Sequence, residues 1–194
     1  MKVISIMIAF TILIFLESAC GTTSISKQQI KTLDSLNGAV NTAANALRRT
    51  DTISLNKVLD HYFQYKQFIN AKLQDTITKS EALDLKVFYN SGEALLNFNK
   101  NKLVVLTRLN LLNTQTEKLT KDLIDGHLNE VERKKYFNLE LAEANKEIQL
   151  AFALEKEYIL NFEKFTQSLK AIEDIIRRYN QNQLPTIIKT ANTF

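Results

Sequence analysis

Residues 129 to 181 read NEVERKKYFNLELAEANKEIQLAFALEKEYILNFEKFTQSLKAIEDIIRRYNQ, and their apolar side chains recur in alternating steps of four and three. The positions on this seam are Phe137, Leu141, Ala144, Ile148, Ala151, Glu155, Tyr158, Phe162, Phe165, Leu169, Ile172, Ile176 and Tyr179. Only Glu155 is neither apolar nor aromatic. A repeat sustained over about six heptads predicts one long helix with left-handed, coiled-coil-like packing.

The ends of this segment carry helix start and stop signals. Asn129 is a good N-cap with Glu132 three residues later, and Arg177 and Arg178 suit the negative end of the helix dipole. Pro185 then disfavours continuation. A helix of this length would be roughly 75 to 80 Å long.

A second long helix is predicted from about Ser80 to Asp125. Thr78 and Glu81 form a capping-box pattern at its start, and Gly126 is a natural stop. Gly92 lowers the local helix propensity, and we expect a bend there at most. The predicted seam consists of Phe88, Ser91, Leu95, Phe98, Lys102, Val105, Leu109, Leu112, Thr116, Leu119 and Leu123.

The preceding residues, 25 to 73, form two further apolar faces. The first face is Ile30, Leu33, Val40, Ala44 and Leu47, and the second is Leu55, Leu59, Tyr62, Ile69 and Leu73. Between them, Arg48 to Thr52 resembles a basic helix end followed by a fresh cap. The break is compatible with a hairpin, which leaves a bare two-helix arm, or with a kink, which gives three roughly equal rods.

The three-rod alternative is favoured because a bare arm would expose a contiguous apolar surface, which is rare on a monomer. The residues concerned are Leu103, Val104, Val105, Leu106, Leu109, Leu111 and Leu112. The predicted fold is therefore all-α: an elongated antiparallel helical bundle with coiled-coil-like packing, whose first rod is broken near residue 50. Scarce Gly and Pro, 4 and 1 in 194 residues, agree with few, long elements.

The first twenty residues have the organisation of an export signal. Lys2 precedes a nearly uniform apolar run from Val3 to Leu16, which is short for a membrane span, and Ser18-Ala19-Cys20 follows. This end resembles the lipobox of bacterial lipoproteins, although Glu17 stands where that family usually has an apolar residue. An uncleaved signal anchor with a free thiol is the alternative.

The resemblance implies cleavage before Cys20, the only cysteine, and attachment of diacylglycerol and a fatty acid such as palmitate. It also implies a place in the cell envelope, with sorting to the outer membrane because Gly21 follows the cysteine. The domain boundaries predicted on this basis are a signal peptide at 1–19, a lipidated linker at 20–25, the bundle at 26–182 and a tail at 183–194.

Catalytic and metal-binding patterns do not emerge. His61 and His127 lack the Glu three residues earlier that di-iron bundles use, and zinc-ligand spacing is missing as well. We interpret His61 as a core or interfacial residue and His127 as a solvated loop residue. The prediction is a protein that is not an enzyme and has no cofactor and no metal.

The charge pattern indicates solvated helix faces. The net charge is +4, and basic residues alternate with acids, as in Glu155-Lys156-Glu157, which argues against a nucleic-acid partner. The predicted function is a membrane-tethered interaction or scaffold module with a protein partner that the sequence does not identify. The alternatives are a periplasmic holdase or lipid carrier, and an immunity or inhibitor lipoprotein.

Overall fold

The computed structural model describes residues 22–73 and 77–187, and every regular element in these ranges is a helix. The elements are α1 (Thr22–Arg48), α2 (Thr52–Lys72), α3 (Lys79–Ile124) and α4 (Glu130–Tyr179). The all-α bundle is therefore confirmed. The first helix begins at Thr22, so residues 22–25 of the predicted 20–25 linker are helical. The helix starts this early because the sequence from Thr22 to Arg48 contains no helix stop.

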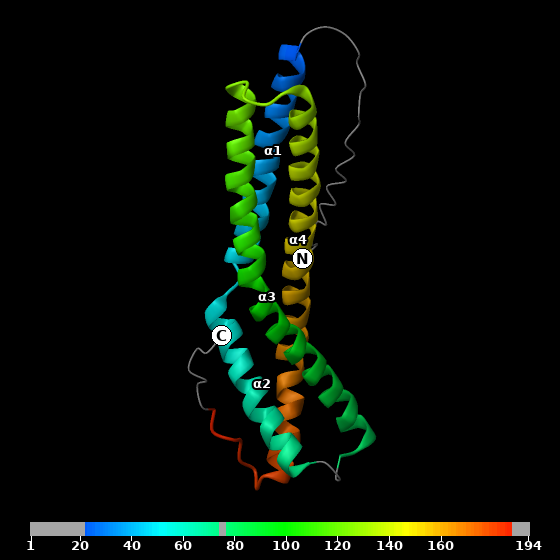
Figure 1. The fold of residues 1–194 in the computed structure, drawn as a ribbon. Coiled ribbons are helices and arrows are strands. Elements are labelled where there is room, and N and C mark those ends of the chain that lie inside the picture. Colours follow the sequence, from blue (N-terminus) through cyan, green and yellow to red (C-terminus); the bar gives the residue numbers. More distant parts are fainter. Residues whose placement is uncertain (1–21, 74–76, 188–194) are drawn as a thin grey trace, which may run out of the picture.

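The four helices form three rods. α3 and α4 run antiparallel along the whole molecule, α1 packs beside them at the end that holds the α3–α4 turn, and α2 packs beside them at the other end (Figure 1). α1 and α2 each contact α3 and α4 but do not pack against each other. The first rod is thus kinked and does not form a hairpin, which resolves the alternative in favour of three rods.

The kink is an end of one helix followed immediately by the start of the next. The amide of Thr50 still bonds to the carbonyl of Leu47 at 3.4 Å, which closes α1. Asp51 then caps α2, because its Oδ1 accepts bonds from the amides of Ile53 and Ser54, both at 3.0 Å. The predicted fresh cap is confirmed.

The predicted ends of the two long helices are also confirmed. Thr78 and Asn129 each form a complete capping box, with Glu81 and Glu132 respectively. Gly126 adopts a φ of +69°, a left-handed conformation that glycine adopts without steric cost just after a helix. α3 continues through Gly92 as one helix.

The buried aromatic rings of the described core all lie in the half of the rod around α2, here called the aromatic half. Around α1 the buried side chains are small or aliphatic: Leu33, Leu36, Val40, Ala43, Ala44, Leu47, Val105, Leu109, Leu112, Leu119, Leu123, Ala144 and Ala151. Around α2, aliphatic side chains such as Leu55, Leu59 and Ile69 are buried together with six rings: Tyr62, Tyr65, Phe88, Phe98, Tyr158 and Phe165. Larger side chains hold helix axes further apart, and the helices spread more widely in the aromatic half (Figure 1).

The predicted register is right for α3 and half right for α4. Every predicted seam position of α3 is buried except Lys102, which is half-buried. On α4, Ala144, Ala151, Tyr158, Phe165 and Ile172 are buried as predicted. At the second heptad position, burial falls one residue earlier than predicted in three heptads: Glu147, Leu154 and Ser168 are buried, while the predicted Ile148, Glu155, Phe162 and Leu169 are half-buried. Ile176 is buried as predicted, and Tyr179 is exposed although it was predicted on the seam.

Candidate functional sites

The predicted lipid-attachment residue, Cys20, lies outside the described residues. α1 begins two positions later, at Thr22, and this start lies beside the α3–α4 turn (Figure 1). Within the described ranges, none of the helices is both long and apolar enough to cross a bilayer.

The two histidines stand apart from each other. The Nδ1 of His61 lies 2.7 Å from the carbonyl oxygen of Lys57, and its ring meets Tyr65 edge-on with 5.6 Å between centroids. His127 is exposed, and its Nδ1 lies 3.7 Å from Asp122 Oδ1. Both interpretations from the sequence agree with these positions. The described part of the chain contains no group of His, Cys, Asp and Glu able to hold a metal ion.

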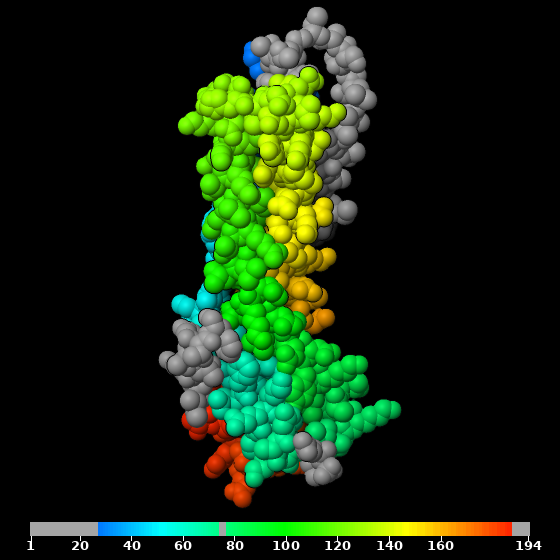
Figure 2. All heavy atoms as spheres, viewed as in Figure 1, coloured from blue at the N-terminus to red at the C-terminus, as the bar shows by residue number. Residues whose placement is uncertain are grey.

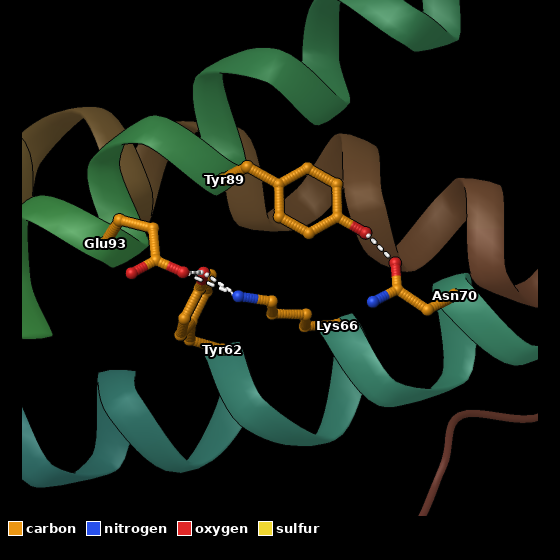
Figure 3. Close-up of polar contacts among 5 residues, drawn as sticks. All are labelled: Tyr62, Lys66, Asn70, Tyr89 and Glu93. Atoms are coloured by element: carbon orange, nitrogen blue, oxygen red, sulfur yellow. Dashed lines mark hydrogen bonds and ion pairs between the residues drawn. The ribbon is translucent and has the colours of Figure 1, made fainter.

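The most connected polar cluster joins α2 to α3 in the aromatic half (Figure 3). Tyr62 donates its hydroxyl to Glu93 Oε1 at 2.5 Å, and Lys66 Nζ lies 2.5 Å from the same oxygen. Lys66 also donates to the Tyr62 hydroxyl at 2.9 Å. One turn further along α2, Asn70 accepts a bond from the Tyr89 hydroxyl at 2.9 Å. Two helices are therefore bridged at two successive turns.

The electrostatics of this cluster fix its protonation state. Burial, followed by the bond to Glu93, raises the pKa of Tyr62 to about 12. Hydrogen bonds from Lys66 and Tyr62 hold the pKa of Glu93 below its usual value, and the bond to Glu93 raises that of Lys66. At neutral pH the three groups are a neutral phenol, a carboxylate and an ammonium. They form a structural clamp in which the Glu93 carboxylate accepts bonds from both other groups.

A glycine makes room for this clamp. A Cβ added to Gly92 would lie 2.1 Å from Cδ2 of Tyr62, closer than real Cβ atoms approach other atoms. Gly92 therefore lets the fully buried ring of Tyr62 lie directly against the backbone of α3. From the sequence, Gly92 indicates only a loss of helix propensity, because nothing local shows which ring comes to lie on it.

A second polar cluster surrounds the kink. Lys102 Nζ donates to Thr50 Oγ1 at 2.5 Å, and burial lowers the pKa of Lys102. From α4, Tyr158 lies close enough to Asp51 for that carboxylate to raise its pKa, although burial is the larger cause. All three rods meet here.

At the end opposite the α3–α4 turn, an ion pair joins α3 to α4. Glu81 is the capping-box residue of α3, and its backbone amide and its carboxylate both bond to Thr78. Its other carboxylate oxygen lies 3.0 Å from Arg178 Nη2, in the last turn of α4. One buried carboxylate thus completes a helix cap and joins two helix ends.

The α3–α4 groove holds a pocket of about 390 Å³ close to the turn. It is lined by Gln115, Lys118, Leu119, Asp122, Leu128, Tyr136 and Glu140. Burial, and then the neighbouring Glu143, raise the pKa of Glu140, whose Oε2 is buried without a hydrogen-bond partner. The walls combine both signs of charge, and the pocket opens to solvent beside an exposed ring.

In comparisons with known proteins, no family model, no curated protein and no solved structure matches the chain. The candidate sites therefore rest on the geometry alone. Sequence reasoning found neither the clamp nor the pocket. The one local signal is for the clamp: Tyr62 and Lys66 are four residues apart and therefore lie on one helix face.

Proposed function

We propose that the chain is a lipoprotein of the cell envelope, tethered through Cys20, that presents a rigid helical rod to a protein partner. The observation that carries the proposal is the position of α1. Its first residue, Thr22, is two positions after Cys20 and lies at one end of the rod. An acyl group on Cys20 would therefore fix that end, and not the middle of the rod, at the membrane surface.

The rod then projects its other end into the surrounding compartment. α4 has 50 residues, which corresponds to about 75 Å at 1.5 Å per residue. The far end is held together by the pair of Glu81 with Arg178 and by the clamp of Tyr62, Lys66 and Glu93. These contacts bind three helices into one unit, as a scaffold or spacer requires.

The far end also offers apolar side chains to a partner. Leu83 and Val87 lie one turn apart on α3, and both are exposed although they are large aliphatic residues. Side chains four residues apart on a helix lie on the same face. This pair is the surface on which we place the partner contact.

A non-enzymatic role is supported by the chemistry of the clusters. The Tyr62 phenol stays protonated well above neutral pH, and Glu93 is engaged by two donors. A catalytic base or nucleophile needs a group whose pKa lies near the operating pH. The clamp moves its groups away from that range.

A holdase or lipid carrier is the second candidate, and one observation favours it. Leu103, Val104 and Leu111 are exposed in the middle of α3, even though α1 and α4 cover the opposite face of that helix. Such a protein would bind 8-anilinonaphthalene-sulfonate strongly. A rod whose apolar surface is buried would give almost no fluorescence enhancement.

The anchor is tested by Cys20→Ala in the full chain. We expect it to remove incorporation of labelled palmitate and to leave a larger precursor. Ser18→Ala, which keeps a small residue before the cysteine, should mature normally and serves as the control. Equal labelling of the Cys20→Ala variant and the unchanged protein would refute the anchor.

The partner surface is tested by a photo-cross-linking amino acid at position 83. We expect one discrete adduct in intact cells, which Val87→Asp in the same chain should weaken. The same amino acid at Leu111, in the middle of the rod, is the control. Identical adducts from both positions would contradict a partner contact confined to the far end.

A further inference from the structure

The end of the rod at the α3–α4 turn carries exposed apolar side chains. Ile124 is the last residue of α3 and Val131 is the second residue of α4, and they expose 65% and 77% of their surfaces. They flank the turn at Gly126, where α3 and α4 meet at one end of the described part of the rod (Figure 2). The start of α1 lies at the same end (Figure 1). We call residues 124–131 the turn tip.

The turn tip and the anchor lie at the same end of the rod. Thr22 is two residues after Cys20, and two residues span at most about 7 Å. We propose that the turn tip is a membrane-contact surface, in which Ile124 and Val131 enter the interfacial region of the bilayer that holds the lipid anchor. This inference rests on the proposed anchoring through Cys20.

The charges around the turn tip indicate an apolar contact and not an electrostatic one. The basic residues from 121 to 135 are Lys121, Arg133, Lys134 and Lys135, and the acidic ones are Asp122, Asp125, Glu130 and Glu132. The two sets balance when His127 is neutral. Attraction to anionic lipid requires an excess of basic residues, so the contact should persist at high salt.

A second contact would change what the anchor does. Acyl chains alone hold a protein at the membrane but do not fix its orientation, whereas apolar side chains in the interface add a second attachment point. Two attachment points at one end restrain the tilt of a rod. The far end, with Leu83 and Val87, would then be held at a defined height above the lipid.

Fluorescence quenching by lipid tests the contact, because the chain contains no Trp. The full-length anchored protein with Val131→Trp is reconstituted into phosphatidylcholine vesicles with or without bromine on the acyl chains. We expect the bromines to reduce the emission about two-fold, since interfacial apolar groups lie ~5–10 Å deep at the headgroup boundary. The quenching should be unchanged at high salt.

Leu83→Trp provides the matched control, because Leu83 is 62% exposed and apolar but lies near the opposite end of α3. Its emission should be unaffected by the bromines. Equal quenching at both positions would mean that the rod lies along the membrane, and would overturn the proposal. Loss of the quenching at high salt would overturn it as well.

Flotation of the vesicles separates the two proposals. Protein that floats with the vesicles while Val131→Trp stays unquenched overturns the membrane contact and leaves the anchor intact. Protein that does not float overturns both the anchor and the contact. Ile124→Trp repeats the measurement on the other side of the turn and should be quenched as strongly as Val131→Trp.

Discussion

Two glycines on helix interiors should respond to the same substitution with opposite signs. Gly38 lies on α1 with nothing within 4 Å of an added Cβ, whereas a Cβ on Gly92 would lie 2.1, 2.4 and 2.7 Å from three ring carbons of Tyr62. Gly38→Ala should therefore stabilise the fold. Gly92→Ala should destabilise it, although both changes favour the helix itself.

The magnitudes follow from two opposing effects. Replacing a helical Gly by Ala gains up to about 1 kcal/mol, which corresponds to a rise of about 2–4 °C in Tm for a domain of this size. At Gly92 the gain is offset by overpacking, which typically amounts to about 1–3 kcal/mol or more. The ring of Tyr62 cannot easily withdraw, because it is fully buried and its hydroxyl is held by Glu93 and Lys66.

Thermal unfolding followed by far-ultraviolet circular dichroism measures both variants. A double-mutant cycle with Tyr62→Leu isolates the contact, because Leu removes the ring while keeping an apolar side chain. Gly92→Ala should lose most of its destabilising effect in the Tyr62→Leu background. If Gly92→Ala raised Tm as much as Gly38→Ala does, the packing of Tyr62 on α3 would be wrong.

Three further substitutions test the core, a half-buried carboxylate and a helix cap in the same assay. Phe165→Ala should decrease stability by about 3–5 kcal/mol, because the ring is fully buried, and Lys156→Ala by under about 0.5 kcal/mol; equal losses would refute the register of α4. Glu140→Gln should raise Tm at neutral pH. Burial raises the pKa of this carboxyl in the folded protein above its unfolded value of about 4.3. The protonated carboxyl therefore stabilises the fold below the unfolded pKa, and this contribution to the free energy of unfolding is lost as pH rises through the folded pKa. A gain of the same size in acid would contradict this. Asn129→Ala removes an N-cap and should lose about 1 kcal/mol, unlike Asn138→Ala inside the helix; equal effects would refute the cap.

The register of α4 shows that an apolar pattern alone does not define which residues of a helix are buried. The side chains in steps of four and three were predicted to form a narrow seam, but α4 packs against both α3 and the first rod, so its buried face is wider than a seam. Two positions on that face are polar. Glu147 lies 3.5 Å from Arg108 of α3, and Ser168 bonds to the carbonyl of Phe165 in its own helix.

A hydropathy pattern does not show which polar side chains find a partner on another helix. Glu147 is not one of the predicted seam positions, and charged residues are rarely buried without a partner. Its burial depends on Arg108, which lies 39 positions away in the chain and reaches it only after α3 and α4 have paired. Ile148 was predicted on the seam instead, and it is half-buried at the edge of the wider face.

The helix ends were predictable because their signals are local. Thr78 with Glu81 and Asn129 with Glu132 satisfy the first backbone amides of a helix within three residues. No distant contact is needed for that. The clamp is the opposite case, because Glu93 is 27 positions from Lys66 and becomes its partner only through the pairing of α2 with α3.

The position of the kink is determined by all three rods together. Lys102 on α3 and Glu155 on α4 were treated as isolated polar interruptions of two seams, yet both lie at the level of the break in the first rod. Lys102 donates to Thr50 there. Glu155 precedes Tyr158 by one turn, and Tyr158 lies close enough to Asp51 for that carboxylate to affect its pKa.

Buried aromatic rings join the aliphatic side chains of the core from the same level onward. Ala43 and Ala44 allow α1 to approach the other rods closely, whereas Tyr62 and Tyr65 hold α2 further out. A single straight helix could not follow both spacings. The chain therefore ends α1 where the spacing changes and restarts the helix at Asp51, whose side chain accepts bonds from the first amides of α2. Lys102 of the α3 seam lies against this break and donates to the side chain of Thr50.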